Sequence, residues 1–174
     1  MIAGIGVPQI TAILETAKVA KTYNIPTIAD GGLMTSGDIV KAIAAGASAV
    51  MSGSLFAGCS ESPGKMVTIN GKKYKSYRWM GSISAMKTGS AARYGQEYRI
   101  GGEKKLIAEG VEGLVPYKGS LTQVITQLAG GLRAGMYYAG VKNIRQLQEN
   151  TRFIKVTQAS LAENYPHDIV LGEG

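Results

Sequence analysis

The fold is decided by residues 25–54, which read IPTIADGGLMTSGDIVKAIAAGASAVMSGS. Two short apolar runs, 25–29 and 47–51, have the near-continuous hydrophobicity of buried parallel strands. Between them Thr35 offers an N-cap, with Asp38 at the capping-box position, and apolar residues follow at helical spacing. The stretch therefore predicts a strand, a helix and a second strand.

A further helix is predicted before this stretch, beginning at Pro8 and closing at Tyr23-Asn24. The resulting order of helix, strand, helix and strand is a βαβ pattern, which argues for an α/β fold with a parallel sheet.

The pattern changes after residue 64. Two strand-like runs, 66–69 and 72–75, flank Asn70-Gly71, which is a strong signal for a β-hairpin with a type I′ turn. The Gly-rich residues 80–119 show little periodicity, and a loop of this length in a compact chain is commonly a lid.

Ser120 and Gln123 form a capping-box pattern that opens a helix running through Leu132. Gly130-Gly131 is expected to interrupt that helix for close packing. Beyond it we expect a short helix from Asn143, a strand at 153–157 and an irregular tail from Ser160.

Length and composition narrow the class of protein. The chain has 174 residues, is 45% hydrophobic, and contains one Cys and one His. It is long enough for one domain with a real core, and it has too few thiols and imidazoles for a disulfide framework or a Cys-rich zinc site. We expect no signal peptide and no membrane span, and the single Cys suits a cytoplasmic protein.

The net charge of +7 is concentrated in residues 65–118, which hold eleven bases and four acids. No nucleic-acid motif accompanies them, so we expect a solvated or anion-facing insertion rather than a nucleic-acid surface.

Candidate site residues follow the two predicted strands. Asp30-Gly31-Gly32 would suit a sugar hydroxyl, and Gly53-Ser54 would present backbone N–H groups to a phosphate. Patterning alone leaves open whether these residues bind a ligand or only form turns.

Two other candidates are weaker as bare patterns. Arg93-Tyr94 would place a guanidinium and a phenol over a bound ligand, or would simply be a solvated surface pair. Cys59 has no basic neighbour in sequence, so an inert thiol is expected, and His167 is expected to be an exposed tail residue.

Several strings in linear order resemble one family, inosine-5′-monophosphate (IMP) dehydrogenase, in the C-terminal part of its (β/α)8 TIM barrel. They are Gly4-Ile-Gly-Val-Pro-Gln9, Ile28-Ala-Asp-Gly-Gly32, Gly53-Ser-Leu-Phe-Ala57, Tyr77-Arg-Trp-Met-Gly-Ser82, Arg93-Tyr94, Glu109-Gly-Val-Glu-Gly113 and Tyr117-Lys-Gly119.

The resemblance implies NAD-dependent oxidation of IMP to XMP. In that family a Cys attacks C2 of the purine and hydride leaves to NAD, after which an Arg-Tyr pair on a flap activates water. By motif, Arg93 and Tyr94 would be the water-activating pair. The IMP-binding residues would be Asp30, Gly31, Gly32, Gly53, Ser54, Tyr77, Met80, Gly81 and Glu109.

The resemblance also implies a potassium ion held by backbone carbonyls at Glu163, Asn164 and Tyr165, and a bacterial-type homotetramer. In such an assembly Tyr138 would complete the NAD adenine pocket of a neighbouring subunit. The chain would be one incomplete catalytic domain, with barrel β/α units at 1–64, a hairpin and flap insertion at 65–118, and the last barrel helix and C-terminal segment at 119–174.

Three positions depart from the family pattern. Trp79 stands where the family has Gly, Gly95 replaces a Phe, and Cys59-Ser60 replaces Thr-Glu. Trp79 is expected to block the purine site or to reshape the flap.

The family's nucleophilic Gly-Ser-x-Cys-Thr-Thr-Arg loop would precede Gly4, so the sequence predicts a fragment that is inactive alone. Such a fragment would need the remainder of the barrel in cis or in trans, and it would self-associate through its exposed apolar faces. A GMP reductase and a non-catalytic nucleotide-binding remnant stay as alternatives.

Overall fold

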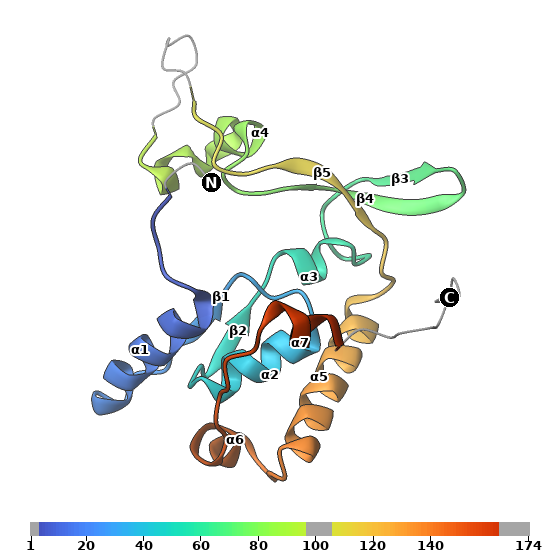
Figure 1. The fold of residues 1–174 in the computed structure, drawn as a ribbon. Coiled ribbons are helices and arrows are strands. Elements are labelled where there is room, and N and C mark those ends of the chain that lie inside the picture. Colours follow the sequence, from blue (N-terminus) through green and yellow to red (C-terminus); the bar gives the residue numbers. More distant parts are fainter. Residues whose placement is uncertain (1–3, 97–105, 164–174) are drawn as a thin grey trace.

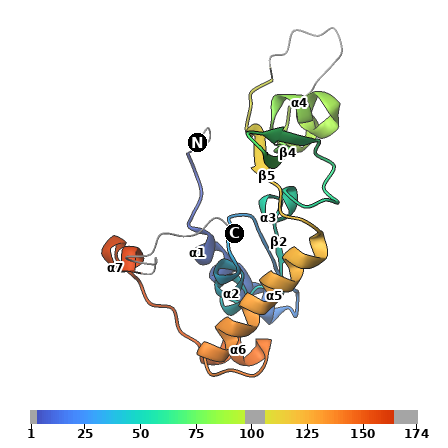
Figure 2. The ribbon, with the colours of Figure 1, turned by 90° about the vertical axis from the view of Figure 1, so that its right-hand side faces the viewer.

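The computed structural model describes residues 4–96 and 106–163. They form a body of helices around a short parallel sheet, from which an arm of antiparallel strands extends (Figure 1). Figure 2 shows the arm standing above the body, joined to it near helix α3 (Ser54–Ala57).

The body begins with the predicted alternation. Helix α1 (Gln9–Thr22), strand β1 (Ile28–Asp30), helix α2 (Ser36–Ala44) and strand β2 (Ala49–Met51) follow one another along the chain. The two strands pair in parallel, which confirms the α/β class, although each has only three residues. Whether these elements belong to a closed barrel stays a prediction.

The capping box that opens α2 is confirmed in both directions. The Asp38 amide donates to Thr35 Oγ1 over 3.3 Å, and the Thr35 amide donates back to Asp38 Oδ2 over 3.0 Å. Burial raises the pKa of Asp38, but hydrogen bonds from Lys41, Met34 and Thr35 outweigh it and lower the pKa to about 2. The Asp38 carboxylate therefore stays charged at neutral pH and can accept the hydrogen bonds of the capping box.

The core lies on one face of the β1–β2 sheet. Ala29 and the buried side of α2 pack there against residues from α1, α3 and helix α6 (Ile144–Asn150). The opposite face is uncovered, with Ile28 59% and Met51 51% exposed. Parallel strands are normally buried on both faces, so this sheet lacks a cover on one side among the described residues.

Helix α5 (Leu121–Tyr138) packs along α2, and its Ser120–Gln123 capping box is confirmed. The expected interruption at Gly130-Gly131 is wrong, because the helix continues through both glycines. The expected close packing is right: a Cβ added to Gly131 would lie 2.2 Å from Ser36 Oγ, so α2 leaves no room for a side chain.

The arm consists of β3 (Met66–Ile69), β4 (Lys72–Arg78) and β5 (Glu112–Pro116). The hairpin is confirmed, with positive φ at both Asn70 and Gly71. The interpretation of 80–119 as loop is wrong in part, because β5 pairs antiparallel with β4. Strand β5 owes its conformation to the backbone of β4, which its own residues do not reveal.

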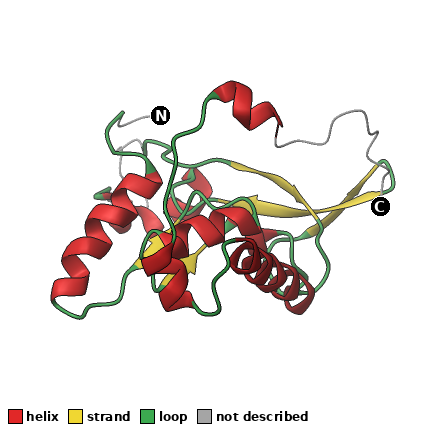
Figure 3. Ribbon diagram, turned by 60° about the horizontal axis from the view of Figure 1, so that its bottom comes forward, coloured by secondary structure: helices red, strands yellow, loops and turns green. Residues whose placement is uncertain are grey.

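Between β4 and residue 96 the chain forms three short helical turns, which are α4 (Ile83–Ala85), η1 (Met86–Ser90) and η2 (Ala91–Tyr94). Figure 3, coloured by secondary structure, shows the long strands of the arm and the short strands of the body among the helices.

Two expectations for the C-terminal part are wrong. Residues 153–157 form no strand, since they are exposed and find no partner strand among the described residues. The segment from Ser160 is not irregular throughout, because helix α7 (Gln158–Glu163) includes its first residues. The predicted helix after Asn143 is confirmed as α6, capped by the Asn143 side chain.

In residues 4–96 and 106–163, no helix combines the length and the apolar character needed to cross a membrane.

Candidate functional site

The carboxyl ends of β1 and β2 lie side by side, as the sequence predicts. The Gly31 amide donates to the Met51 carbonyl over 3.1 Å, which joins the loop after β1 to the last residue of β2. Gly31 and Gly32 both have positive φ, a conformation that favours glycine. Gln9 Nε2 donates to the main-chain oxygen of Asp30 over 3.0 Å, and Asp30 itself is exposed. Its carboxylate is therefore available to a ligand.

Tyr77 of β4 reaches the loop after β2 from the arm. A Cβ added to Gly53 would lie 2.7 Å from the Tyr77 hydroxyl oxygen, so the phenol occupies the space beside that glycine. Ser54 follows Gly53 as the first residue of α3. The fold thus brings three of the predicted IMP-binding residues, Gly53, Ser54 and Tyr77, together from the loop after β2, α3 and the arm.

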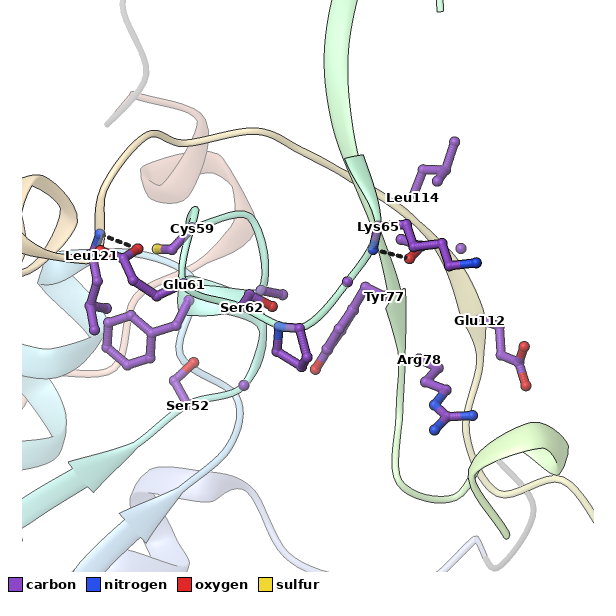
Figure 4. Close-up of a pocket in the computed structure, with 17 residues that line it drawn as sticks. Ser52, Cys59, Glu61, Ser62, Lys65, Tyr77, Arg78, Glu112, Leu114 and Leu121 are labelled. Atoms are coloured by element: carbon purple, nitrogen blue, oxygen red, sulfur yellow. Dashed lines mark hydrogen bonds between the residues drawn. The ribbon is translucent and has the colours of Figure 1, made fainter. Parts of the chain in front are cut away.

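Gly53 and Tyr77 border a cavity of about 1100 Å³ between the body and the base of the arm (Figure 4). Its polar lining includes Ser52 from the loop after β2 and Tyr77, Arg78 and Glu112 from the arm, and Phe56 adds an apolar surface. In Figure 4 the Tyr77 ring projects from β4 toward the loop that carries Ser52. A phosphorylated ligand entering here would meet both a phenol and main-chain N–H groups.

A second group of predicted residues gathers beyond β4. The Glu109 amide donates to the Gly81 carbonyl over 2.8 Å, and a Cβ added to Gly81 would lie 3.1 Å from Tyr94 Cζ. Gln96 Nε2 donates to Glu109 Oε1 over 3.2 Å, and Ser90 Oγ donates to the Met80 carbonyl over 2.5 Å. The fold therefore places Gly81, Glu109 and Tyr94 in contact, whereas Arg93 is exposed beside them.

Arg78 and Glu112 are site residues that the sequence reasoning missed. They face one another across the β4–β5 ladder. Arg78 donates to Ser84 Oγ over 3.2 Å and to Thr88 Oγ1 over 3.3 Å, while Glu112 Oε1 accepts from the Ser84 amide over 3.1 Å. Hydrogen bonds from Ser84, together with the Arg78 charge, lower the pKa of Glu112. Only the pairing of β5 with β4 reveals this cluster.

Tyr138 lies away from both groups. It is the last residue of α5, and Figure 1 shows that end of α5 beside α6, at the opposite end of the molecule from the arm. Its side chain is 87% exposed and meets the Tyr137 ring edge-on at 5.8 Å between centroids. The pair is therefore not among the residues that border the cavity.

The predicted potassium residues are only partly within the described structure. Glu163 ends α7, whereas Asn164 and Tyr165, like His167, lie outside the described residues. Within residues 4–96 and 106–163 no cluster of three His, Cys, Asp or Glu side chains is suited to a metal.

The positions that depart from the family pattern have local explanations. Trp79 is 49% exposed, and a Cβ added to Gly110 would lie 2.7 Å from Trp79 Cβ, so the glycine leaves room for this residue. Its effect on purine binding or on the flap stays a prediction. Gly95 adopts a left-handed conformation that ends η2, which a Phe would adopt only with strain. Cys59 belongs to the cavity wall but is only 1% exposed, in keeping with the expected inert thiol.

Comparison with known proteins gives a consistent result. Residues 1–167 match the model of the IMP dehydrogenase / GMP reductase domain. The chain is 57% identical to an inosine-5′-monophosphate dehydrogenase of Rhodopirellula baltica. The match includes 98% of this chain and 31% of that protein. The inosine-5′-monophosphate dehydrogenase of Methanocaldococcus jannaschii is 54% identical over 98% of this chain, and the match covers 36% of that protein. The one of Borreliella burgdorferi is 54% identical over 97% of this chain, and the match covers 42% of that protein. The chain thus spans about a third of the length of the first two.

Proposed function

The chain belongs to the IMP dehydrogenase / GMP reductase family, and from that premise we propose that it supplies part of the nucleotide site and the flap of an enzyme that oxidises IMP to XMP. The observation that carries this proposal is the Tyr77 hydroxyl beside Gly53, at the edge where β1 and β2 end. Ligands of α/β proteins bind at that edge.

The nucleotide would be held at its ribose and its phosphate by the residues after β1 and β2. The exposed Asp30 carboxylate is suited to accept hydrogen bonds from ribose hydroxyls. The amides of Gly53 and Ser54, together with the Tyr77 hydroxyl, are donors of the kind that a phosphate accepts. Gly31 and Gly32 let the backbone approach the sugar without steric obstruction.

The purine would extend toward Met80, Gly81 and Glu109. A main-chain hydrogen bond joins Gly81 to Glu109, so the two segments lie side by side. Tyr94 packs against Gly81, and the exposed Arg93 precedes it in η2. This arrangement supports the proposal that Arg93 and Tyr94 activate water next to the purine.

NAD, when bound, would accept hydride from the purine. Within this chain only Tyr138 is proposed to meet it, at the adenine of a neighbouring subunit in a homotetramer. The 87% exposure of this side chain fits a role across an interface. Potassium binding through carbonyls at 163–165 remains a proposal that rests on the family resemblance.

We also propose that the remainder of a barrel, in cis or in trans, covers the open face of the β1–β2 sheet and provides the cysteine nucleophile. The exposed Ile28 and Met51 support this, since they lie on strands of a type that is usually buried on both faces. Cys59, at 1% exposure, is poorly placed to attack a purine.

The direct test is a chimera in which this chain replaces the matched third of the Rhodopirellula baltica relative. We expect the chimera to form NADH and XMP from IMP, and a matched chimera with Tyr94→Phe to lose most of that activity. NADPH consumption with GMP would instead favour a GMP reductase.

A non-catalytic remnant is the remaining alternative. Its signature would be an inactive chimera that regains activity when Trp79 is replaced by Gly. Titration of the chain alone with IMP and with inosine gives the independent measure of nucleotide binding, because a preference for IMP requires a phosphate site.

A further inference from the structure

Lys75 is a buried cation that the proposed reaction does not use. It lies in the middle of β4 and is only 4% exposed. Its ammonium group donates to the main-chain carbonyl of Ser60 over 3.0 Å and also to that of Ser62. Lysines are rarely buried unless they are paired, so these two hydrogen bonds identify a specific attachment between the arm and the loop after α3.

Lys75 and Tyr77 lie on the same face of β4, since side chains two residues apart in a strand point the same way. Both reach the same stretch of chain, which is residues 53–62: Tyr77 lies beside Gly53, and Lys75 binds the carbonyls near its end. One face of one strand therefore meets this stretch at two points, of which the Lys75 point is hydrogen-bonded.

The loop that Lys75 binds is also hydrogen-bonded to the segment that follows β5. The Ser60 amide donates to the Gly119 carbonyl over 2.8 Å, and the Ser60 and Tyr117 hydroxyls lie 2.8 Å apart. Those bonds connect the loop to the chain after β5. Toward β4, Ser76 Oγ accepts from the Lys65 amide over 2.8 Å at the far end of the loop, whereas Lys75 reaches farther back, to Ser60 and Ser62. Without the ammonium, β4 would keep its strand pairing but lose this attachment to the loop.

We propose that Lys75 is a positioning residue for phosphate recognition: by holding the carbonyls of Ser60 and Ser62 against β4, it keeps the Tyr77 hydroxyl beside Gly53. This inference rests on the proposed function, because it assumes that the phosphate of IMP binds at that point. Lys75 does not touch the nucleotide and acts through Tyr77.

The test uses Lys75→Met, Tyr77→Phe, the double variant and Lys73→Met. Lys73 is the matched control, since it is an exposed lysine on the same strand. Affinities for IMP and for inosine are measured by calorimetry, and unfolding is followed by circular dichroism. If Lys75→Met does not fold, Lys75→Gln, which keeps one donor group, takes its place.

We expect Lys75→Met to reduce the preference for IMP over inosine about tenfold, the scale of one hydrogen bond to a charged group, while inosine binding stays unchanged. Lys73→Met should have no effect. The double variant should bind IMP no more weakly than the weaker single variant, because both changes remove the same interaction.

Equal weakening of IMP and inosine, or additive losses in the double variant, would overturn the inference and leave Lys75 as a purely structural residue. If the unmodified chain binds neither ligand, it is the proposed function that fails. Hydrogen exchange then decides the positioning role: amides at 52–56 and 60–64 should exchange faster in Lys75→Met than in Lys73→Met, and equal rates would refute it.

Discussion

The contact between α5 and α2 allows a sharp prediction at two adjacent glycines. A Cβ added to Gly131 would lie 2.2 Å from Ser36 Oγ and 2.3 Å from Ser36 Cβ, whereas a Cβ added to Gly130 meets nothing within 4 Å. Ser36 has little freedom to move, because it is the first residue of α2 and follows the Thr35 cap. Gly131→Ala and Gly130→Ala are therefore the same chemical change in two different surroundings.

The expected energies differ in sign. Replacing Gly by Ala within a helix stabilises it by about 1 kcal/mol, and Gly130→Ala should gain that amount. Gly131→Ala gains the same helix propensity but incurs overpacking, which costs about 1–3 kcal/mol. The overlap involves a Cβ bound directly to backbone, so the upper end applies, and we expect a net loss of about 2 kcal/mol.

The assay is urea unfolding followed by circular dichroism, at one fixed protein concentration for all variants. Ser36→Gly should rescue Gly131→Ala in part, because it removes both contacting atoms and leaves the nearest one, Ser36 Cα, at 3.8 Å. The reasoning is refuted if Gly131→Ala proves as stable as Gly130→Ala, since α5 would then not lie against α2 as described.

Three further outcomes are expected. Gly53→Ala should weaken IMP binding about tenfold without changing inosine binding, because its Cβ would displace the Tyr77 hydroxyl; equal losses for both ligands in calorimetry would argue against a phosphate role. Asp38→Ala should cost about 1 kcal/mol in the free energy of unfolding at pH 7. Because folding lowers the pKa of Asp38 to about 2, the stabilisation by its carboxylate is complete above about pH 4 and is lost as the pH falls through 2. The unfolding curves of the variant and the parent should therefore converge near pH 2. Expressed alone, the chain should self-associate in sedimentation experiments through the open face at Ile28 and Met51, and a stable monomer would contradict this.

Much of the fold was accessible from local pattern. The capping boxes at Thr35 and Ser120 and the turn at Asn70-Gly71 were predicted correctly, because each depends on contacts within four residues. The errors fall where residues distant in the sequence decide the structure. Strand β5 forms because β4 offers its backbone for pairing, and residues 153–157 form no strand because none of the strands in residues 4–96 and 106–163 pairs with them.

The same division holds for the candidate site. The sequence by itself determined which residues follow the strands and, through its motifs, to which family they belong. Only the tertiary structure decided that the Tyr77 hydroxyl lies beside Gly53, that Arg78 faces Glu112, and that Lys75 holds the loop. The physical reason is that helix caps and turns are fixed by neighbouring residues, whereas a site between two elements depends on how the chain packs over long separations.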